Sequence, residues 1–367
     1  MIDISGMTAT EIKSMVSGLN NAFWGSKINL NFLTKLCGVK KTNGLSFTNS
    51  PGWAGLDIAQ HRAKGAAITE RDIFTYKKTI TLEAKDASWN FGMDDLAEVE
   101  PIGDTVSEVT SKINPLWGDT IHAGFVEFIT NNAGQFGVLS SGYSCLGYDA
   151  AALYANSHYG GVLDNIAPYT GATPPDVEND FWVAWKQLRA AKIPGTNRYF
   201  WAGVALADCQ PVIMFPPELE EVMNNVFGAE QYMTMSQGTA YNSPQSNVLA
   251  DGTVLNKPIL IPSPYLTDIS TTQWYVFLAD MSCSPSEQPV QIVFNPFKSS
   301  KGQRGEAIRN GVDVGFGDNG NGLGDLFSLA FLGEGSEVWI RESKAVLASK
   351  TNMGFLAHNP YRTIRIG

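Results

Sequence analysis

The feature that most constrains the fold of this chain is a long stretch of helical periodicity between Ile102 and Asn132. Apolar residues recur there every three or four positions, which is the spacing of one face of an α-helix. They are Ile102, Val106, Val109, Ile113, Trp117, Ile121, Phe125 and Phe128. A helix of this length extends about 45 Å at about 1.5 Å per residue. The pattern therefore predicts a spine helix with Val106, Ile113 and Phe125 in the core, bent near Asn114 because Pro115 removes a backbone donor.

The region before this helix has a different pattern. Between Leu45 and Phe91 the alternation of Ile80, Leu82 and Ala84 predicts strand, and the whole stretch predicts a long two-stranded ribbon. A ribbon of two strands is marginal in water, so it needs a surface to lie on. Further upstream, a Thr-Ala-Thr-Glu capping pattern begins a short amphipathic helix at Thr8–Trp24.

The region after the spine predicts a mixed lobe. An amphipathic helix is expected at Pro175–Lys192, with Val177, Phe181, Trp185 and Leu188 facing inward, and a short helix is expected to begin at Pro216-Pro217-Glu218. Strands are expected at Phe200–Leu206, Pro211–Phe215, Leu255–Ile261, Trp274–Ala279, Val290–Phe294, Val312–Phe316 and Val338–Arg341. The predicted class is α+β with mixed, mostly antiparallel pairing.

Composition limits the function. The chain of 367 residues is 44% hydrophobic, which is enough for a substantial core, and its 17% of charged residues lies below the usual level of about 25%. A net charge of −10 argues against a sequence-reading nucleic-acid binder, which needs a basic face to neutralise phosphates. No stretch approaches the ~18 apolar residues of a membrane span, and Met1–Thr10 lacks the features of an export signal. Four widely separated cysteines predict reduced thiols in a cytoplasmic product.

The few segments that resemble catalytic or metal-binding signatures have structural explanations. Ser157-His158 could be a nucleophile and its base, but an elbow needs flanking glycines and an acid partner, so a structural turn is the better interpretation. His61, His122 and His358 have no second ligand at helical spacing. We therefore expect no catalytic residue, no metal and no cofactor.

Several short segments, in this order along the chain, resemble one known family. They are Gly52-Trp53-Ala54-Gly55, Thr79-Ile80-Thr81-Leu82 through Asp94-Asp95, Leu153-Tyr154-Ala155-Asn156-Ser157-His158, Phe215-Pro216-Pro217-Glu218-Leu219-Glu220, Lys257-Pro258-Ile259-Leu260-Ile261, Ser263-Pro264-Tyr265-Leu266-Thr267-Asp268 and Trp274-Tyr275-Val276-Phe277. Together with the order of elements, they resemble the major capsid proteins of tailed bacteriophages with the Hong Kong 97 phage capsid fold, and most of all the major head subunit of Mu-like phages. The resemblance covers roughly Thr8 to Phe331. The tail from about Gly333 to Gly367 lies outside it.

The resemblance implies a division of the chain into five parts. These are an N-terminal arm (1–44), an extended hairpin (45–100), a peripheral domain with the spine helix (101–174), an axial domain (175–290), and a return to the peripheral domain with a C-terminal extension (291–367). It also implies a structural protein whose hexamers and pentamers close an icosahedral shell around phage DNA. The hairpin would lie across a neighbouring subunit and gain its partners there. We expect neighbour contacts at Trp53, Thr79, Ile80, Thr81 and Leu82.

The resemblance also implies partners and a location. A separate scaffold, a portal and a decoration protein would join the shell, packaged double-stranded DNA would lie near it without sequence-specific contact, and no membrane would be involved. Assembly is expected in the host bacterial cytoplasm, and the final location is the virion capsid. Two alternatives stay open: an encapsulin-like nanocompartment shell, and a cytosolic α+β enzyme.

Overall fold

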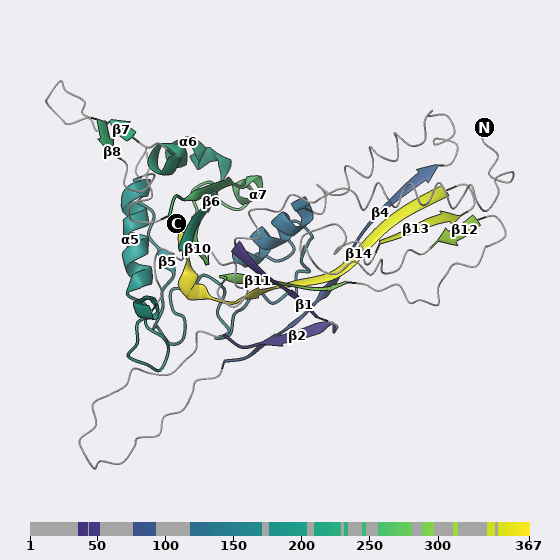
Figure 1. Cartoon of the computed structure of the whole chain (residues 1–367), viewed down its shortest axis with the longest axis horizontal. Coiled ribbons are helices and arrows are strands. Elements are labelled where there is room, and N and C mark those ends of the chain that lie inside the picture. Colours follow the sequence, from purple (N-terminus) through teal and green to yellow (C-terminus); the bar gives the residue numbers. More distant parts are fainter. Residues whose placement is uncertain are drawn as a thin grey trace, which may run out of the picture.

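The computed structural model describes residues 36–42, 44–51, 76–92, 118–170, 176–203, 209–228, 231–233, 244–246, 256–280, 288–296, 311–314, 336–341 and 344–367. Figure 1 shows two parts, a compact lobe built around α5 (Val177–Arg189) and an arm of long strands that extends away from it. We call these parts the lobe and the arm. Within the described residues, no helix is both long and apolar enough to cross a membrane.

The strands outside the lobe are β1 (Cys37–Lys41), β2 (Ser46–Asn49), β3 (Lys78–Thr81), β4 (Glu83–Gly92), β11 (Val290–Pro296), β12 (Gly311–Val314), β13 (Ser336–Arg341) and β14 (Lys344–Ala357). The lobe contains β5 (Ile166–Ala167), α5, η2 (Phe200–Gly203), β6 (Cys209–Phe215), η4 (Pro217–Leu219), α6 (Glu220–Met223), η5 (Asn224–Gly228), β7 (Gln231–Met233), β8 (Pro244–Ser246), β9 (Ile259–Pro262), α7 (Pro264–Thr267), β10 (Trp274–Asp280), η6 (Pro360–Arg362) and β15 (Thr363–Ile366).

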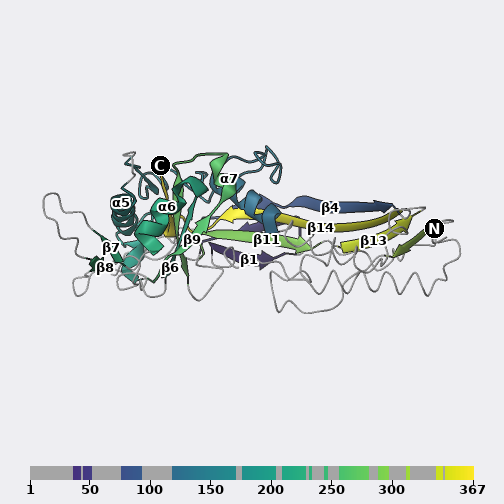
Figure 2. The same ribbon diagram turned by 90° about the horizontal axis from the view of Figure 1, so that it is seen from above.

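The arm is a six-stranded sheet organised around β14. Along one edge of β14, β11 and β13 follow each other end to end, with Val290 opposite Ala357 and Ser336 opposite Ser349. Along the other edge, the whole length of β4 pairs with β14. Viewed from above in Figure 2, these strands form a thin, extended blade. The C-terminal tail, which lay outside the family resemblance, thus supplies the central strand of the arm.

The lobe is built on a five-stranded sheet in the order β5-β15-β10-β6-β9. Successive side chains of a strand point to opposite faces, and in β10 both sets are buried. Tyr275 and Phe277 enter a core shared with the helical residues 118–129, whereas Trp274 and Val276 enter a second core beneath α5. A sheet covered on both faces positions every element packed on it. Its strands β5 and β15 come from outside the expected axial segment 175–290.

Helix α5 confirms its sequence prediction. The Asp176 side chain accepts a hydrogen bond from the Asn179 backbone N–H at 3.1 Å and caps the helix. The four residues expected to face inward are all buried. Phe181 lies 5.4 Å from the ring of Phe227 in η5, centroid to centroid. The apolar stripe therefore fastens α5 to both the sheet and the short helical segment after β6.

The described end of the expected spine is helical from 118 to 129. Phe125 is fully buried, with its ring centroid 5.9 Å from Phe277 of the lobe sheet and 6.4 Å from Phe355 of the arm sheet. This helix therefore packs where the two sheets meet. Val106, Ile113 and the bend expected at Pro115 lie outside the described residues, as does the helix expected at Thr8–Trp24.

The structure corrects one prediction. The strand expected at Phe200–Leu206 is wrong in its described part, because Phe200–Gly203 is a 3-10 turn. Phe200 and Trp201 are consecutive and both enter the core beneath α5, which a strand could not achieve because its neighbouring side chains diverge. In the described part of the ribbon, β4 pairs with β14 of its own chain, and the contact expected between the ribbon and a neighbouring subunit stays a prediction.

Four of the other expected strands are confirmed and two are confirmed in part. Strand β9 begins only at Ile259 of the expected Leu255–Ile261, and β12 ends at Val314, the last described residue of the expected Val312–Phe316. The expected strands at Pro211–Phe215, Trp274–Ala279, Val290–Phe294 and Val338–Arg341 correspond to β6, β10, β11 and β13. The ribbon is also antiparallel at its base, where β2 pairs with β3. Main-chain pairing across the described residues is mixed and mostly antiparallel, as the sequence predicted.

Candidate functional site: the junction between lobe and arm

The most elaborate polar site in the described structure lies where β14 of the arm turns into β15 of the lobe. We call residues 358–362 the junction. They are buried although most are polar: His358 is 1% exposed, Asn359 0% and Arg362 3%. Buried polar groups destabilise a fold unless they are hydrogen-bonded. The contacts of the junction therefore decide how firmly the two parts are joined.

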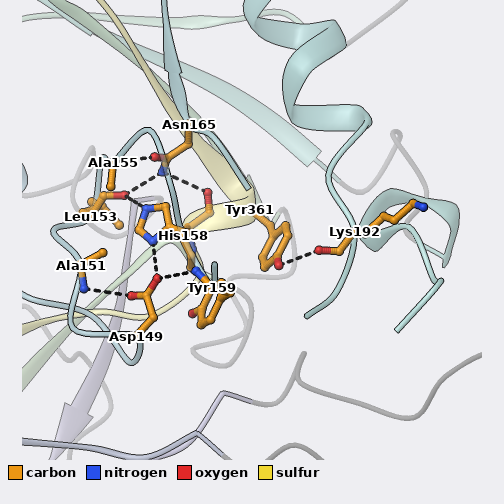
Figure 3. A network of polar contacts seen from close by, with 10 residues as sticks. Asp149, Ala151, Leu153, Ala155, His158, Tyr159, Asn165, Lys192 and Tyr361 are labelled. Carbon is orange, nitrogen blue, oxygen red and sulfur yellow. Dashed lines mark hydrogen bonds and ion pairs between the residues drawn. The ribbon is translucent and has the colours of Figure 1, made fainter. Parts of the chain in front are cut away.

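Three tyrosines bracket the junction. The Tyr148 hydroxyl lies 2.8 Å from Nδ1 of His358, and the Tyr154 hydroxyl lies 2.7 Å from Oγ1 of Thr363, the first residue of β15. The Tyr361 hydroxyl donates to the backbone carbonyl of Lys192 at 2.8 Å, beyond the end of α5 (Figure 3). Burial raises the pKa of Tyr148, Tyr154 and Tyr361. All three phenols therefore stay neutral at physiological pH and act as hydrogen-bonding anchors.

A buried pair of His158 and Asp149 shapes the loop that carries Tyr148 and Tyr154. Nδ1 of His158 lies 2.8 Å from Oδ2 of Asp149, and Nε2 of His158 lies 3.2 Å from the Leu153 carbonyl (Figure 3). Asp149 also accepts from the backbone N–H groups of Ala151 and Tyr159. Burial alone would raise the pKa of Asp149, but the His158 ring and these donors hold it below its usual value. Both ring nitrogens of His158 face acceptors of the protein, which is the arrangement of a structural imidazole and not of a catalytic base.

Asn165 connects this loop to the junction. Its Oδ1 accepts from the Ala155 backbone N–H at 2.9 Å, and its Nδ2 donates to the carbonyls of Leu153 at 2.7 Å and Pro360 at 3.4 Å (Figure 3). Its own carbonyl accepts from the N–H of Arg365 in β15. One buried amide thus holds the loop, the junction and the lobe sheet together.

Arg362 is a buried guanidinium at the end of the junction. Its Nη1 donates to the Leu278 carbonyl at 3.3 Å and to Sγ of Cys209 at 3.5 Å. Its Cζ lies 5.8 Å from the ring centroid of Trp201, within cation–π range. Trp201 reaches this position because of the 3-10 turn that replaces the expected strand. The misassigned segment is therefore part of the site.

A second contact region fixes the ribbon to the base of the arm. Glu83, at the start of β4, accepts from the Ser140 backbone N–H at 3.0 Å and from its hydroxyl, and pairs with Lys85 at 2.8 Å. Although burial opposes ionisation, Lys85 and Ser140 lower the pKa of Glu83. The Tyr143 hydroxyl donates to the Phe355 carbonyl and accepts from the Phe355 N–H. The loop after the 118–129 helix therefore holds both β4 and β14.

The structure places the predicted contact residues in two environments. Ile80 and Leu82 are 4% and 5% exposed and belong to the core of their own chain, whereas Thr79 and Thr81 point outward. The Thr79 hydroxyl bonds Oγ1 of Thr48 at 2.7 Å across the β2–β3 pair. Trp53 lies outside the described residues. Neighbour contact at all five positions stays a prediction.

The described histidines and cysteines fill structural positions. His122 lies 2.9 Å from Oγ of Ser263, and burial lowers its pKa to about 4. Within the described part of the chain, no cluster of histidine, cysteine or acidic residues could hold a metal ion. Cys37, Cys145 and Cys209 are buried and form no disulfide with one another. His61 and Cys283 lie outside the described residues.

Sequence segments that carried the family resemblance contact each other. The Ser263 N–H donates to the Phe215 carbonyl at 2.8 Å, and the Thr267 hydroxyl donates to Glu218 at 3.0 Å. The segment that includes Leu153 and His158 forms the loop that brackets the junction. These segments are therefore structural determinants. Sequence reasoning missed the junction itself, because its residues show no periodicity and gain their meaning only from distant partners.

Comparison with known proteins gives structural neighbours only. No family model and no curated protein matches the chain. The capsid of a native GTA particle is similar, with 11% identity over 91% of this chain and 88% of that one and a TM-score of 0.49. So is the capsid of Myoviridae phage XM1, with 12% identity, coverage of 93% and 92%, and a TM-score of 0.45. The virus-like particle of Pyrococcus furiosus shows 9% identity, coverage of 97% and 99%, and a TM-score of 0.42. At these identities the likeness is one of chain path and not of residues.

Proposed function

We propose that this chain is a major capsid protein, a structural subunit that assembles as hexamers and pentamers into an icosahedral shell around phage DNA. The observation that carries the proposal is the two-part architecture, in which a lobe covered on both sheet faces is joined through buried residues to a long, thin arm (Figures 1 and 2). The ordered sequence segments that resemble the Hong Kong 97 family support it. Such a subunit functions through its interfaces, and each copy uses unlike surfaces against successive neighbours.

The junction has a direct role in this proposal. A shell closes only if each subunit holds its lobe and arm at a defined angle, because small angular errors accumulate around the shell. The buried bonds of Tyr148, Tyr154, Asn165 and Tyr361 fix that angle within one chain. They serve neither substrate binding nor catalysis in this proposal, and the protein is not an enzyme.

The proposal extends to partners and location. A separate scaffold and a portal protein would act during assembly in the host bacterial cytoplasm, a decoration protein would bind the finished shell, and the shell would form the virion capsid. The acidic balance of the chain, with a net charge of −10, suits a lining that encloses DNA without gripping it.

The test is to express the full chain, alone and beside its scaffold, and to image the large-particle fraction by negative-stain electron microscopy. Closed angular shells are the expected result. Shells that enclose a specific protein and exclude DNA would point to the nanocompartment alternative. A uniform small oligomer under both conditions would contradict the proposal and favour the cytosolic enzyme.

A further inference from the structure

The lobe carries opposite charges at the two ends of α5. From Lys186 to Tyr199 the chain contains four cationic residues and no carboxylate. The cations are Lys186, Arg189, Lys192 and Arg198. None of them forms an ion pair with a described carboxylate. We call this segment the basic end of the lobe.

The basic end is held by backbone hydrogen bonds and includes an exposed aromatic ring. The Ile193 N–H donates to the Arg198 carbonyl at 2.9 Å, and Lys192 forms a β-bridge with Tyr199. The Tyr199 side chain is 47% exposed, and Nζ of Lys192 lies 5.2 Å from its ring centroid. Tyrosine and arginine are enriched in protein interfaces, and a preformed loop loses little conformational entropy on binding.

The other end of α5 is acidic. Glu218, Glu220 and Glu221 are exposed on η4 and α6, and Asp176 and Glu178 are exposed where α5 begins. The contact of Phe181 with Phe227 places η5, the continuation of α6, beside the first half of α5, and Figure 1 shows α6 at that end. The helix dipole accounts for the signs of the charges on α5 itself. It does not account for Lys192 and Arg198, which lie beyond the helix.

We propose that the basic end of one lobe docks against the acidic end of the lobe in a second copy of this chain. This inference rests on the proposed function, because it names the surfaces by which lobes associate in a ring. Two unlike, complementary patches on one body give a head-to-tail contact, which closes into a ring if the rotation allows it. The ends are separated by the length of α5, about 18 Å at about 1.5 Å per residue. One chain therefore cannot satisfy its own patches.

The test is a zero-length carbodiimide cross-link on a mixture of isotopically light and heavy full-length chains, at low salt. The expected product is an amide between Lys192 and Glu220 or Glu221 that carries one light and one heavy peptide. Intermolecular links elsewhere without this one would overturn the inference. Mixed-isotope links at this site without any closed shells would support the inference and count against the proposed function instead.

Charge reversal provides the second measurement. Two double variants reverse the charge of one end each: Arg198→Glu with Lys192→Glu, and Glu220→Lys with Glu221→Lys. Each double variant should lower the lobe–lobe association constant at least about tenfold, because it places like charges opposite one another. The two pairs combined should restore association. Lys257→Glu, the same charge change on an exposed lysine of the lobe, is the matched control and should leave it unchanged. Reversal at the basic end that only weakens the binding of double-stranded DNA, with assembly intact, would overturn the inference and assign this end to DNA.

Discussion

The lobe and the arm are held together in different ways. In the lobe, large side chains from several segments of the chain interlock, and Trp274, Phe181 and Phe227 are fully or almost fully buried around one sheet. In the arm, a single strand of 14 residues pairs with segments that begin at residues 83, 290 and 336. The lobe therefore depends on packing and the arm on main-chain pairing between remote segments. A substitution should act differently depending on which of these it disturbs.

The largest effect is expected from a cavity in the lobe. Phe181 is 1% exposed and contacts the rings of Trp182, Trp185 and Phe227. Phe181→Ala should lower the free energy of unfolding by about 4 kcal/mol, because it removes these contacts and leaves a void. Urea unfolding followed by tryptophan fluorescence measures this. Phe181→Leu, which keeps most of the volume, should lose only about 1 kcal/mol, and an equal loss in both variants would contradict the packing account.

A smaller loss is expected in the loop that brackets the junction. Asp149→Asn removes the charge that faces His158 and places an amide among the donors of Ala151 and Tyr159, which should destabilise the fold by about 3 kcal/mol at pH 7. Because the pKa of Asp149 is lowered in the folded protein, the ionised carboxylate contributes stability above its unfolded pKa. That contribution is lost as the pH falls through the folded value. The difference between the wild type and the variant should therefore shrink below about pH 4.

The matched control for this pair is Asp164→Asn. Asp164 is exposed in the same loop, and among the described contacts its side chain accepts only from the Ile166 N–H, at 3.0 Å. It should cost about 0.5 kcal/mol. An equal loss of unfolding free energy in Asp149→Asn and Asp164→Asn would show that the buried pair of Asp149 and His158 makes no specific contribution to stability.

The arm is tested at Gly354 in β14. A Cβ added there would lie 2.9 Å from Oη of Tyr143 and 3.0 Å from Cδ2 of Leu82. Gly354→Ala should destabilise the protein by about 2 kcal/mol through overpacking, with the loss of hydrogen-exchange protection concentrated in β4 and β14. Combining it with Tyr143→Phe should cost less than the sum of the two single changes, because the phenyl ring leaves room for the methyl group.

Gly142→Ala is the control for this change. A Cβ at Gly142 meets nothing within 4 Å, so the alanine should be tolerated. Loss of protection spread evenly over lobe and arm in Gly354→Ala would contradict the separation of the two parts.

The smallest effect is expected from pH at His122, where the helix of residues 118–129 meets α7. Burial lowers the pKa of His122 to about 4, whereas the unfolded chain takes up this proton near pH 6.5. The unfolded state thus binds more protons between these values, and stability should fall as the pH is lowered from about 6.5 to about 4. Allowing for its partial exposure, the loss should be about 1.5 kcal/mol. His122→Gln should flatten this part of the pH profile, and an unchanged slope would contradict it.

The sequence predicted the elements that depend on local periodicity. The face of α5 followed from the three- and four-residue spacing of Val177, Phe181 and Trp185, and β10 and β11 followed from apolar runs between turns. The strand predicted at Phe200–Leu206 was wrong in its described part. Two adjacent aromatic residues are common in strands, and only their burial in one shared core shows that the backbone must turn there. The alternation of Ile80 and Leu82 indicates that their side chains are buried. It does not indicate which segments cover them.

The C-terminal segment shows most clearly what the sequence alone could not predict. By itself, the sequence determined an α+β protein with an amphipathic helix against a sheet, since side-chain spacing encodes which face of an element is buried. Only the tertiary structure decided that Lys344–Ala357 is the central strand of the arm and that residues 358–362 join it to the lobe. The physical reason is that main-chain hydrogen bonds are made by every residue type alike. The partners of β14, and the tyrosines that hold the junction, are therefore selected by the packing of the whole chain.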